Sequence, residues 1–96
     1  MAMHIGVCTI ELGLPGNDSL KGKRSVIKSV IIRGTQKYNV SIAEVDAQNA
    51  RQRAVLGVVC VSSSERYGHG LLERVVQWIE SSRPDVELLD YQIEFL

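Results

Sequence analysis

Two stretches of the sequence are apolar on both faces of an extended chain, and no other feature restricts the fold as strongly. Residues 3–12 alternate between two apolar sets, which are Ile5 and Val7 on one face and Cys8, Ile10 and Leu12 on the other. Residues 53–61 repeat the pattern, with Ala54, Leu56, Val58 and Cys60 against Val55, Val59 and Val61. A strand that is apolar on both faces is typical of the middle of a sheet. The chain therefore predicts a sheet with these two stretches as central strands.

The segment after the first strand changes to helical spacing. Residues 13–18 form a predicted loop that contains glycine, proline and asparagine, and Ser19 is a suitable N-cap for a helix. From there, one side of a helical wheel collects the apolar positions Leu20, Ile27, Val30, Ile31, Gly34 and Tyr38. We expect this first helix to end at about Tyr38.

The remaining segments supply two more strands and a second helix. Residues 40–46 alternate as a half-exposed edge strand does, and the polar residues 47–52 connect them to the second central strand. Ser62 and Glu65 have the spacing of a capping box, and a second amphipathic helix should end near Arg83 and Pro84. Its apolar stripe consists of Leu71, Leu72, Val75, Val76 and Ile79. In the last strand, residues 86–96, one face carries Leu89, Tyr91, Ile93 and Phe95, and the other carries Asp90, Gln92 and Glu94.

The order of these elements predicts an α+β fold. A β-α-β-β-α-β chain of this length is typical of a ferredoxin-like domain, in which two helices cover one face of a four-stranded antiparallel sheet. We expect residues 1–96 to form a single such domain, because no repeat or linker interrupts the pattern.

The composition excludes several classes of protein. With 45% apolar and 23% charged residues, the chain is an ordinary globular protein and is not disordered. No apolar run approaches the length of a membrane span, and the start of the chain lacks a signal-peptide pattern, so we expect a cytoplasmic protein. Cys8 and Cys60 form no metal-binding or redox spacing, and we expect both to act as small buried hydrophobes.

Three sequence motifs resemble a known family. Residues 19–25 read SLKGKRS, residues 43–48 read AEVDAQ, and residues 52–57 read QRAVLG. Together they make the chain similar to the YlxP-like proteins, a bacterial family of unknown function, over nearly its whole length. The resemblance implies a ferredoxin-like fold, and such proteins are often encoded among genes for translation initiation and ribosome maturation. The chain departs from the family at Gly22, where an acidic residue is usual, and we expect a looser and more positive helix start.

The first helix concentrates positive charge in a chain whose formal net charge is zero. Between Ser19 and Ala43 there is no acidic residue, and the basic residues are Lys21, Lys23, Arg24, Lys28, Arg33 and Lys37. Cations in the first turns are disfavoured by the positive end of the helix, so their crowding makes this segment a candidate functional site. One interpretation is a solvated surface. The other is an anion site that binds successive phosphates along an RNA backbone.

The sheet offers no surface for stacking bases. RNA-recognition domains with a ferredoxin-like fold stack bases on aromatic side chains of their two central strands, and neither central strand here contains one. Any contact with RNA should therefore use the helix and the loops, and should recognise the backbone more than the base sequence.

Other polar residues give weaker indications of a site. Glu44 and Asp46 are expected on one face of the edge strand, with Arg51 and Arg53 across the hairpin. The two carboxylates could act as an acid/base pair or hold Mg²⁺, but cross-strand ion pairs explain the same residues. His4, Cys8 and Cys60 could form a metal site only with a further ligand, which the sequence does not supply. We expect no metal and no cofactor.

Two hypotheses for function follow. The first is a non-enzymatic accessory protein that binds structured RNA or a ribosomal subunit through the basic first helix. The alternative is a homo-oligomeric protein-interaction module with no nucleic-acid role. We also expect a homodimer, because two helices cover only one face of a sheet whose central strands are apolar on both.

Overall fold

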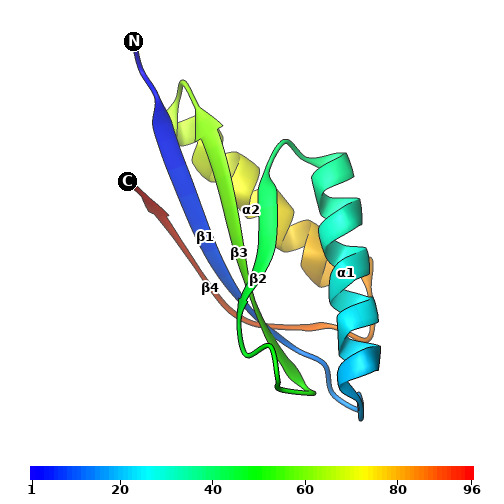
Figure 1. Cartoon of the computed structure of the whole chain (residues 1–96). Coiled ribbons are helices and arrows are strands. Elements are labelled where there is room, and N and C mark those ends of the chain that lie inside the picture. Colours follow the sequence, from blue (N-terminus) through cyan, green and yellow to red (C-terminus); the bar gives the residue numbers. More distant parts are fainter.

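The four strands form one antiparallel sheet in the order β2-β3-β1-β4. The computed structural model describes residues 1–96 (Figure 1). Its elements are β1 (His4–Gly13), α1 (Leu20–Lys37), β2 (Ser41–Asp46), β3 (Arg53–Ser62), α2 (Glu65–Ser82) and β4 (Glu87–Phe95). The ferredoxin-like order is confirmed, with β1 and β3 as the central strands and β2 at an edge.

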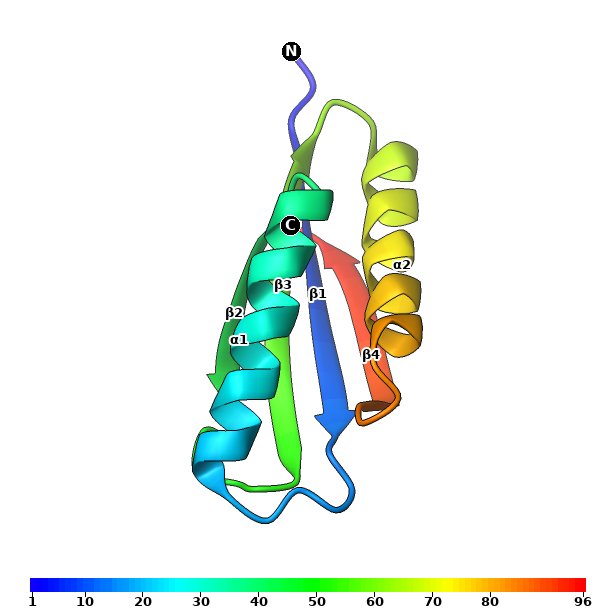
Figure 2. The same ribbon diagram turned by 90° about the vertical axis from the view of Figure 1, so that its right-hand side faces the viewer.

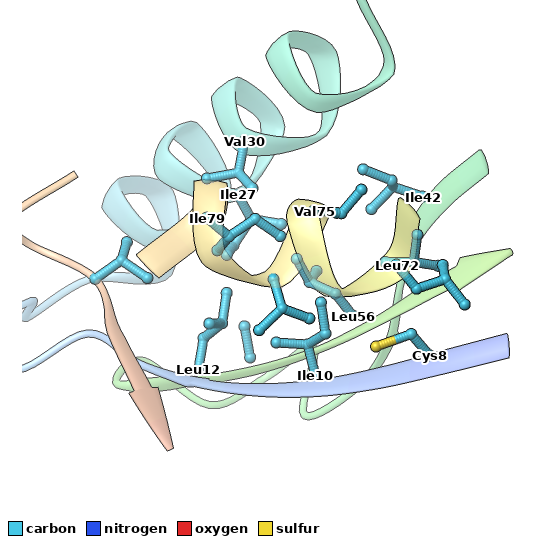
Figure 3. Packing of buried hydrophobic residues seen from close by; sticks show 14 of the residues in the cluster. Cys8, Ile10, Leu12, Ile27, Val30, Ile42, Leu56, Leu72, Val75 and Ile79 are labelled. Atoms are coloured by element: carbon cyan, nitrogen blue, oxygen red, sulfur yellow. The ribbon is translucent and has the colours of Figure 1, made fainter. Parts of the chain in front are cut away.

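Both helices lie on the same face of the sheet (Figure 2). α1 lies on the β2 side, and α2 lies over β1 and β4. Between helices and sheet, side chains from both layers interdigitate in one core that includes Val30 of α1, Val75 of α2 and Ile10 of β1 (Figure 3). Burial of this apolar surface is the main force that holds α1 in place, and with it the cations on its outer side.

The caps of the two helices follow from local hydrogen bonds. Ser19 caps α1 as predicted, because its Oγ accepts from the Gly22 N–H at 3.0 Å. The predicted cap of α2 is wrong: Ser64, and not Ser62, accepts from the Tyr67 N–H at 3.1 Å. β3 continues through Ser62, which pairs with His4, and this delays the start of the helix. No helix of the chain is long and apolar enough to span a membrane.

A β-bulge changes the predicted face of one residue in β4. Glu11 pairs with Asp90 but Leu12 pairs with Leu88, so Leu89 is an extra residue without a partner on β1. Because one extra residue reverses the alternation of faces, Leu88 packs against the core and Leu89 is 47% exposed. The prediction that Leu89 shares a face with Tyr91, Ile93 and Phe95 is therefore wrong.

The second face of the sheet has no helix over it, and its part along β1, β2 and β3 is largely apolar. We define the open sheet face by Ile5, Val7, Val45, Val59 and Val61, which point away from the helices. Val61 is 63% exposed and Val45 is 52% exposed. The central strands thus carry apolar residues on both faces, and the helices cover only one of these faces.

Candidate nucleic-acid interface

Five of the six predicted cations lie on the surface of α1. Lys21, Arg24, Lys28, Arg33 and Lys37 are all exposed. None of the five forms an ion pair with an acidic residue. α1 has no acid in its first turn, so the positive helix end and the first of these charges repel one another.

The cations divide into two groups by their surroundings. The Arg33 guanidinium lies 5.5 Å from the centre of the Trp78 ring, and the Lys37 ammonium lies 5.8 Å from that of Tyr38. These two make cation–π contacts within the protein. Lys21, Arg24 and Lys28 make no comparable contact, and their spacing of three and four residues aligns them along one stripe of the helix. We call these three residues the basic stripe.

Lys23, the sixth predicted cation, is buried. The prediction that it binds an anion does not agree with this position. Its side chain is 0% exposed. Its Nζ donates to the carbonyl oxygens of Ala47 at 2.7 Å, Gln48 at 3.2 Å and Arg53 at 3.1 Å. An ammonium group has three N–H donors, and these carbonyls use all of them. Lys23 therefore holds the β2–β3 loop and has no proton left for a phosphate.

The sequence contains a signal for this burial that the charge pattern concealed. The buried residues of α1 are Lys23, Ile27, Val30 and Gly34. Their spacing of four, three and four residues is that of one buried stripe, so position 23 falls on the core side of the helix. A lysine at such a position usually extends its aliphatic stem until the ammonium group reaches solvent. Here the ammonium group of Lys23 instead donates to the carbonyl oxygens of the β2–β3 loop.

Glu44 compensates the charge of Lys23 without a hydrogen bond from it. Its Oε2 lies 3.0 Å from the Lys23 Nζ, although it is buried and accepts no hydrogen bond. The reason is that the three ammonium protons point to the loop carbonyls. The Glu44 side chain is 18% exposed, so one part of this carboxylate still reaches the surface.

The polar hairpin is arranged differently from the prediction. Glu44 pairs with Leu56 and Asp46 with Val55, and successive residues of β3 point to opposite faces, so the two carboxylates do not share a face. The irregularity between them causes this reversal. Across the hairpin, Arg53 lies 3.8 Å from Glu11 and not beside Glu44, and Arg51 is exposed without an ionic partner.

The loop before α1 ties the helix start to the hairpin. Asn17 Nδ2 donates to the carbonyl oxygens of Ser19 at 2.8 Å and Arg51 at 2.6 Å. A Cβ added to Gly22 would come within 2.6 Å of the Asn17 Oδ1. The glycine therefore makes room for the side chain that joins the loop to the hairpin. With Lys23, these contacts fix the end of the molecule from which the basic stripe begins.

The remaining candidate ligands do not assemble. Cys60 pairs with Gly6, so it lies diagonally across from both His4 and Cys8, but no group of three or more His, Cys, Asp or Glu residues could hold a metal ion. Cys8 is fully buried, and desolvation, with a smaller effect of Glu73, raises the pKa of its thiol to about 11. The thiol is thus held in its unreactive protonated form at neutral pH.

Comparison with known proteins agrees with the resemblance in the motifs. The chain is 39% identical over 83 residues to the uncharacterized protein YlxP of Bacillus subtilis (strain 168), which covers 86% of this chain and 89% of that protein. A family described as "Protein of unknown function (DUF503)" matches residues 5–93. The chain therefore belongs to this family.

Proposed function

We propose that this protein is a non-enzymatic, cytoplasmic accessory factor that binds structured RNA, such as that of a ribosomal subunit, through α1. The observation that carries the proposal is the basic stripe, whose three cations have no acidic partner. At a rise of about 1.5 Å per residue, Lys21 and Lys28 are about 10 Å apart along the helix axis. This reach allows contact with more than one phosphate of a strand, and it suits recognition of backbone shape.

The apolar core supports the proposal by fixing where these charges sit. α1 is anchored by its buried stripe and by the Lys23 contacts, so the backbone that carries the exposed cations needs little ordering when a ligand binds. The corrected position of Lys23 reduces the candidate phosphate contacts to the basic stripe, with Arg33 and Lys37 as a second group.

The test is a fluorescence titration of a labelled RNA hairpin with matched charge variants. The Arg24→Gln, Lys28→Gln double variant should lose most of the binding. The control is the Arg66→Gln, Arg74→Gln double variant, which removes the same charge from the exposed surface of α2. Equal weakening by both variants would indicate only a general effect of net charge and would contradict the assignment to α1.

The open sheet face favours a second function, that of a homodimer. Strands of 10, 6, 10 and 9 residues, at about 3.3 Å per residue and about 4.8 Å apart, present roughly 550 Å². That area lies at the low end for a specific interface, whose standard size is roughly 800 Å² per partner. A second copy presents the same apolar surface, and a two-fold axis closes the assembly. Because α1 lies on the opposite face, dimer formation leaves the basic stripe of both copies accessible.

Sedimentation equilibrium tests this second function. We expect a dimer mass at tens of micromolar for the natural chain and a monomer for Val59→Lys, which places a charge at the centre of the open sheet face. A monomer mass for both proteins would contradict the dimer. High salt should weaken binding of RNA but leave the apolar contact intact or stronger.

A further inference from the structure

A groove of about 270 Å³ lies between α1 and β2, beside the basic stripe. Its apolar walls are formed by Ile27, Ile31 and Ile32 of the helix. Arg24 and Lys28 also line it, and Glu44 enters from β2. Ile32 is 44% exposed, so the groove presents apolar surface to solvent. The volume lies just below the range of about 300 to 1,000 Å³ for small-molecule sites, so the groove suits one compact group.

Glu44 gives this groove an unused hydrogen-bond acceptor. The carboxylate lies 3.0 Å from the Lys23 ammonium, but no N–H or O–H of the protein donates to it. Only Oε2 is both buried and unpartnered, so Oε1 keeps access to the surface. Lys23 compensates the negative charge from behind, which lowers the cost of enclosing the carboxylate against a ligand. The groove thus combines apolar walls, one acceptor group and two cations.

This combination defines the chemistry of a ligand. The ligand needs a flat or compact body for the isoleucine walls, N–H donors for Glu44, and negative charge near Arg24 and Lys28. An unpaired nucleotide meets all three needs, because RNA-binding proteins read such bases on their exposed edges while cations hold the phosphates. Among the bases, guanine presents a ring N–H beside its exocyclic amine. Because Oε2 is buried against Lys23, the accessible Oε1, with its two lone pairs, is the atom that accepts from these two adjacent donors.

We propose that the α1–β2 groove binds a single unpaired guanine nucleotide of the bound RNA, with Glu44 accepting from the base and Arg24 and Lys28 contacting its flanking phosphates. This inference rests on the proposed function and adds a preference to it. It also gives the protein a way to hold a base without aromatic residues on its central strands. Cations of the basic stripe then bind any RNA, and Glu44 selects among RNAs.

The test compares labelled hairpins that differ by one bulged nucleotide, which is guanine, adenine or absent. The natural protein should bind the guanine bulge at least about fivefold more tightly than the other two, since two hydrogen bonds to one base edge discriminate by about that factor or more. Glu44→Gln should bind all three hairpins with the affinity of the natural protein for the paired hairpin. The Arg24→Gln, Lys28→Gln variant should weaken binding of all three.

Two further measurements keep the outcomes distinct. Glu44→Gln also removes the counter-charge of Lys23, so thermal unfolding of this variant is recorded to show that it is folded. Ile32→Gln is a second variant of the groove that leaves the Lys23 contacts intact. Ile32→Gln should likewise lose the guanine preference. Guanosine monophosphate alone should bind far more weakly than the bulged hairpin.

Salt-dependent binding of all hairpins with equal affinity would overturn the guanine proposal but leave the proposed function standing. No binding of any hairpin would overturn both. Tight binding of guanosine monophosphate without a bulge preference would assign the groove to a free nucleotide and contradict its role in RNA recognition.

Discussion

Replacement of Lys23 by methionine should destabilise the protein far more than replacement of any other cation of α1. The change keeps much of the buried stem but removes the ammonium group that binds three carbonyls and lies 3.0 Å from Glu44. Removing one partner of a buried ion pair costs about 3 to 5 kcal/mol. Glu44 is 18% exposed and can recover some hydration, so we expect the lower end, about 3 kcal/mol.

Urea unfolding, monitored by circular dichroism, measures this loss of free energy. In a separate thermal unfolding experiment, the melting temperature should fall by about 12 to 24 °C, because a domain of this size loses about 4 to 8 °C per kcal/mol. Lys28→Met is the control, and this exposed substitution should change the free energy of unfolding by no more than about 0.5 kcal/mol. Hydrogen exchange should also speed up in the Ala47–Gln52 loop. A loss below about 1 kcal/mol for Lys23→Met would refute the anchoring role.

Three further predictions concern single residues. Gly22→Glu should destabilise the protein by up to about 2 kcal/mol in urea unfolding, because displacing Asn17 from its hydrogen bonds costs about 1 to 3 kcal/mol and the helix propensity of glutamate returns only about 1; a gain in stability would contradict the packing. Cys8 should resist alkylation at about pH 8 until urea unfolds the chain, since burial raises its pKa to about 11; rapid alkylation of the native thiol would contradict this. The Tyr91 hydroxyl donates to Glu73 at 2.9 Å, which raises the pKa of the phenol, so its stabilising effect is present below about pH 10 and is lost as the pH rises through the folded value. Ultraviolet titration should show this late phenol moving to lower pH in Glu73→Gln, and an unmoved titration would exclude the contact.

The sequence patterns predicted the elements and their order because those depend on the local periodicity of apolar residues. Central strands that are apolar on both faces, such as Ala54–Val61, can be recognised without knowledge of their partners. The orientation of Leu89 could not be predicted, since it depends on a bulge in the pairing with β1. The same holds for Asp46, which a register irregularity separates from Glu44.

The candidate site was predicted less completely than the fold. Exposed cations such as Arg24 and Lys28 could be found from charge alone. The environment of Lys23 could not, because its partners are backbone carbonyls and a carboxylate that lie 21 to 30 residues further along the chain. The groove beside Glu44 likewise exists only where α1 and β2 meet in the folded chain.

The most direct test of the proposed function is co-sedimentation with ribosomal subunits at about 50 and about 200 mM salt. If the basic stripe contacts three phosphates, the affinity should fall by about 40-fold between these concentrations, through counterion release. The Arg24→Gln, Lys28→Gln variant should bind weakly at both, and the Arg66→Gln, Arg74→Gln variant should follow the natural protein. Binding that does not change with salt, or that survives the loss of Arg24 and Lys28, would contradict a role of α1 in binding RNA.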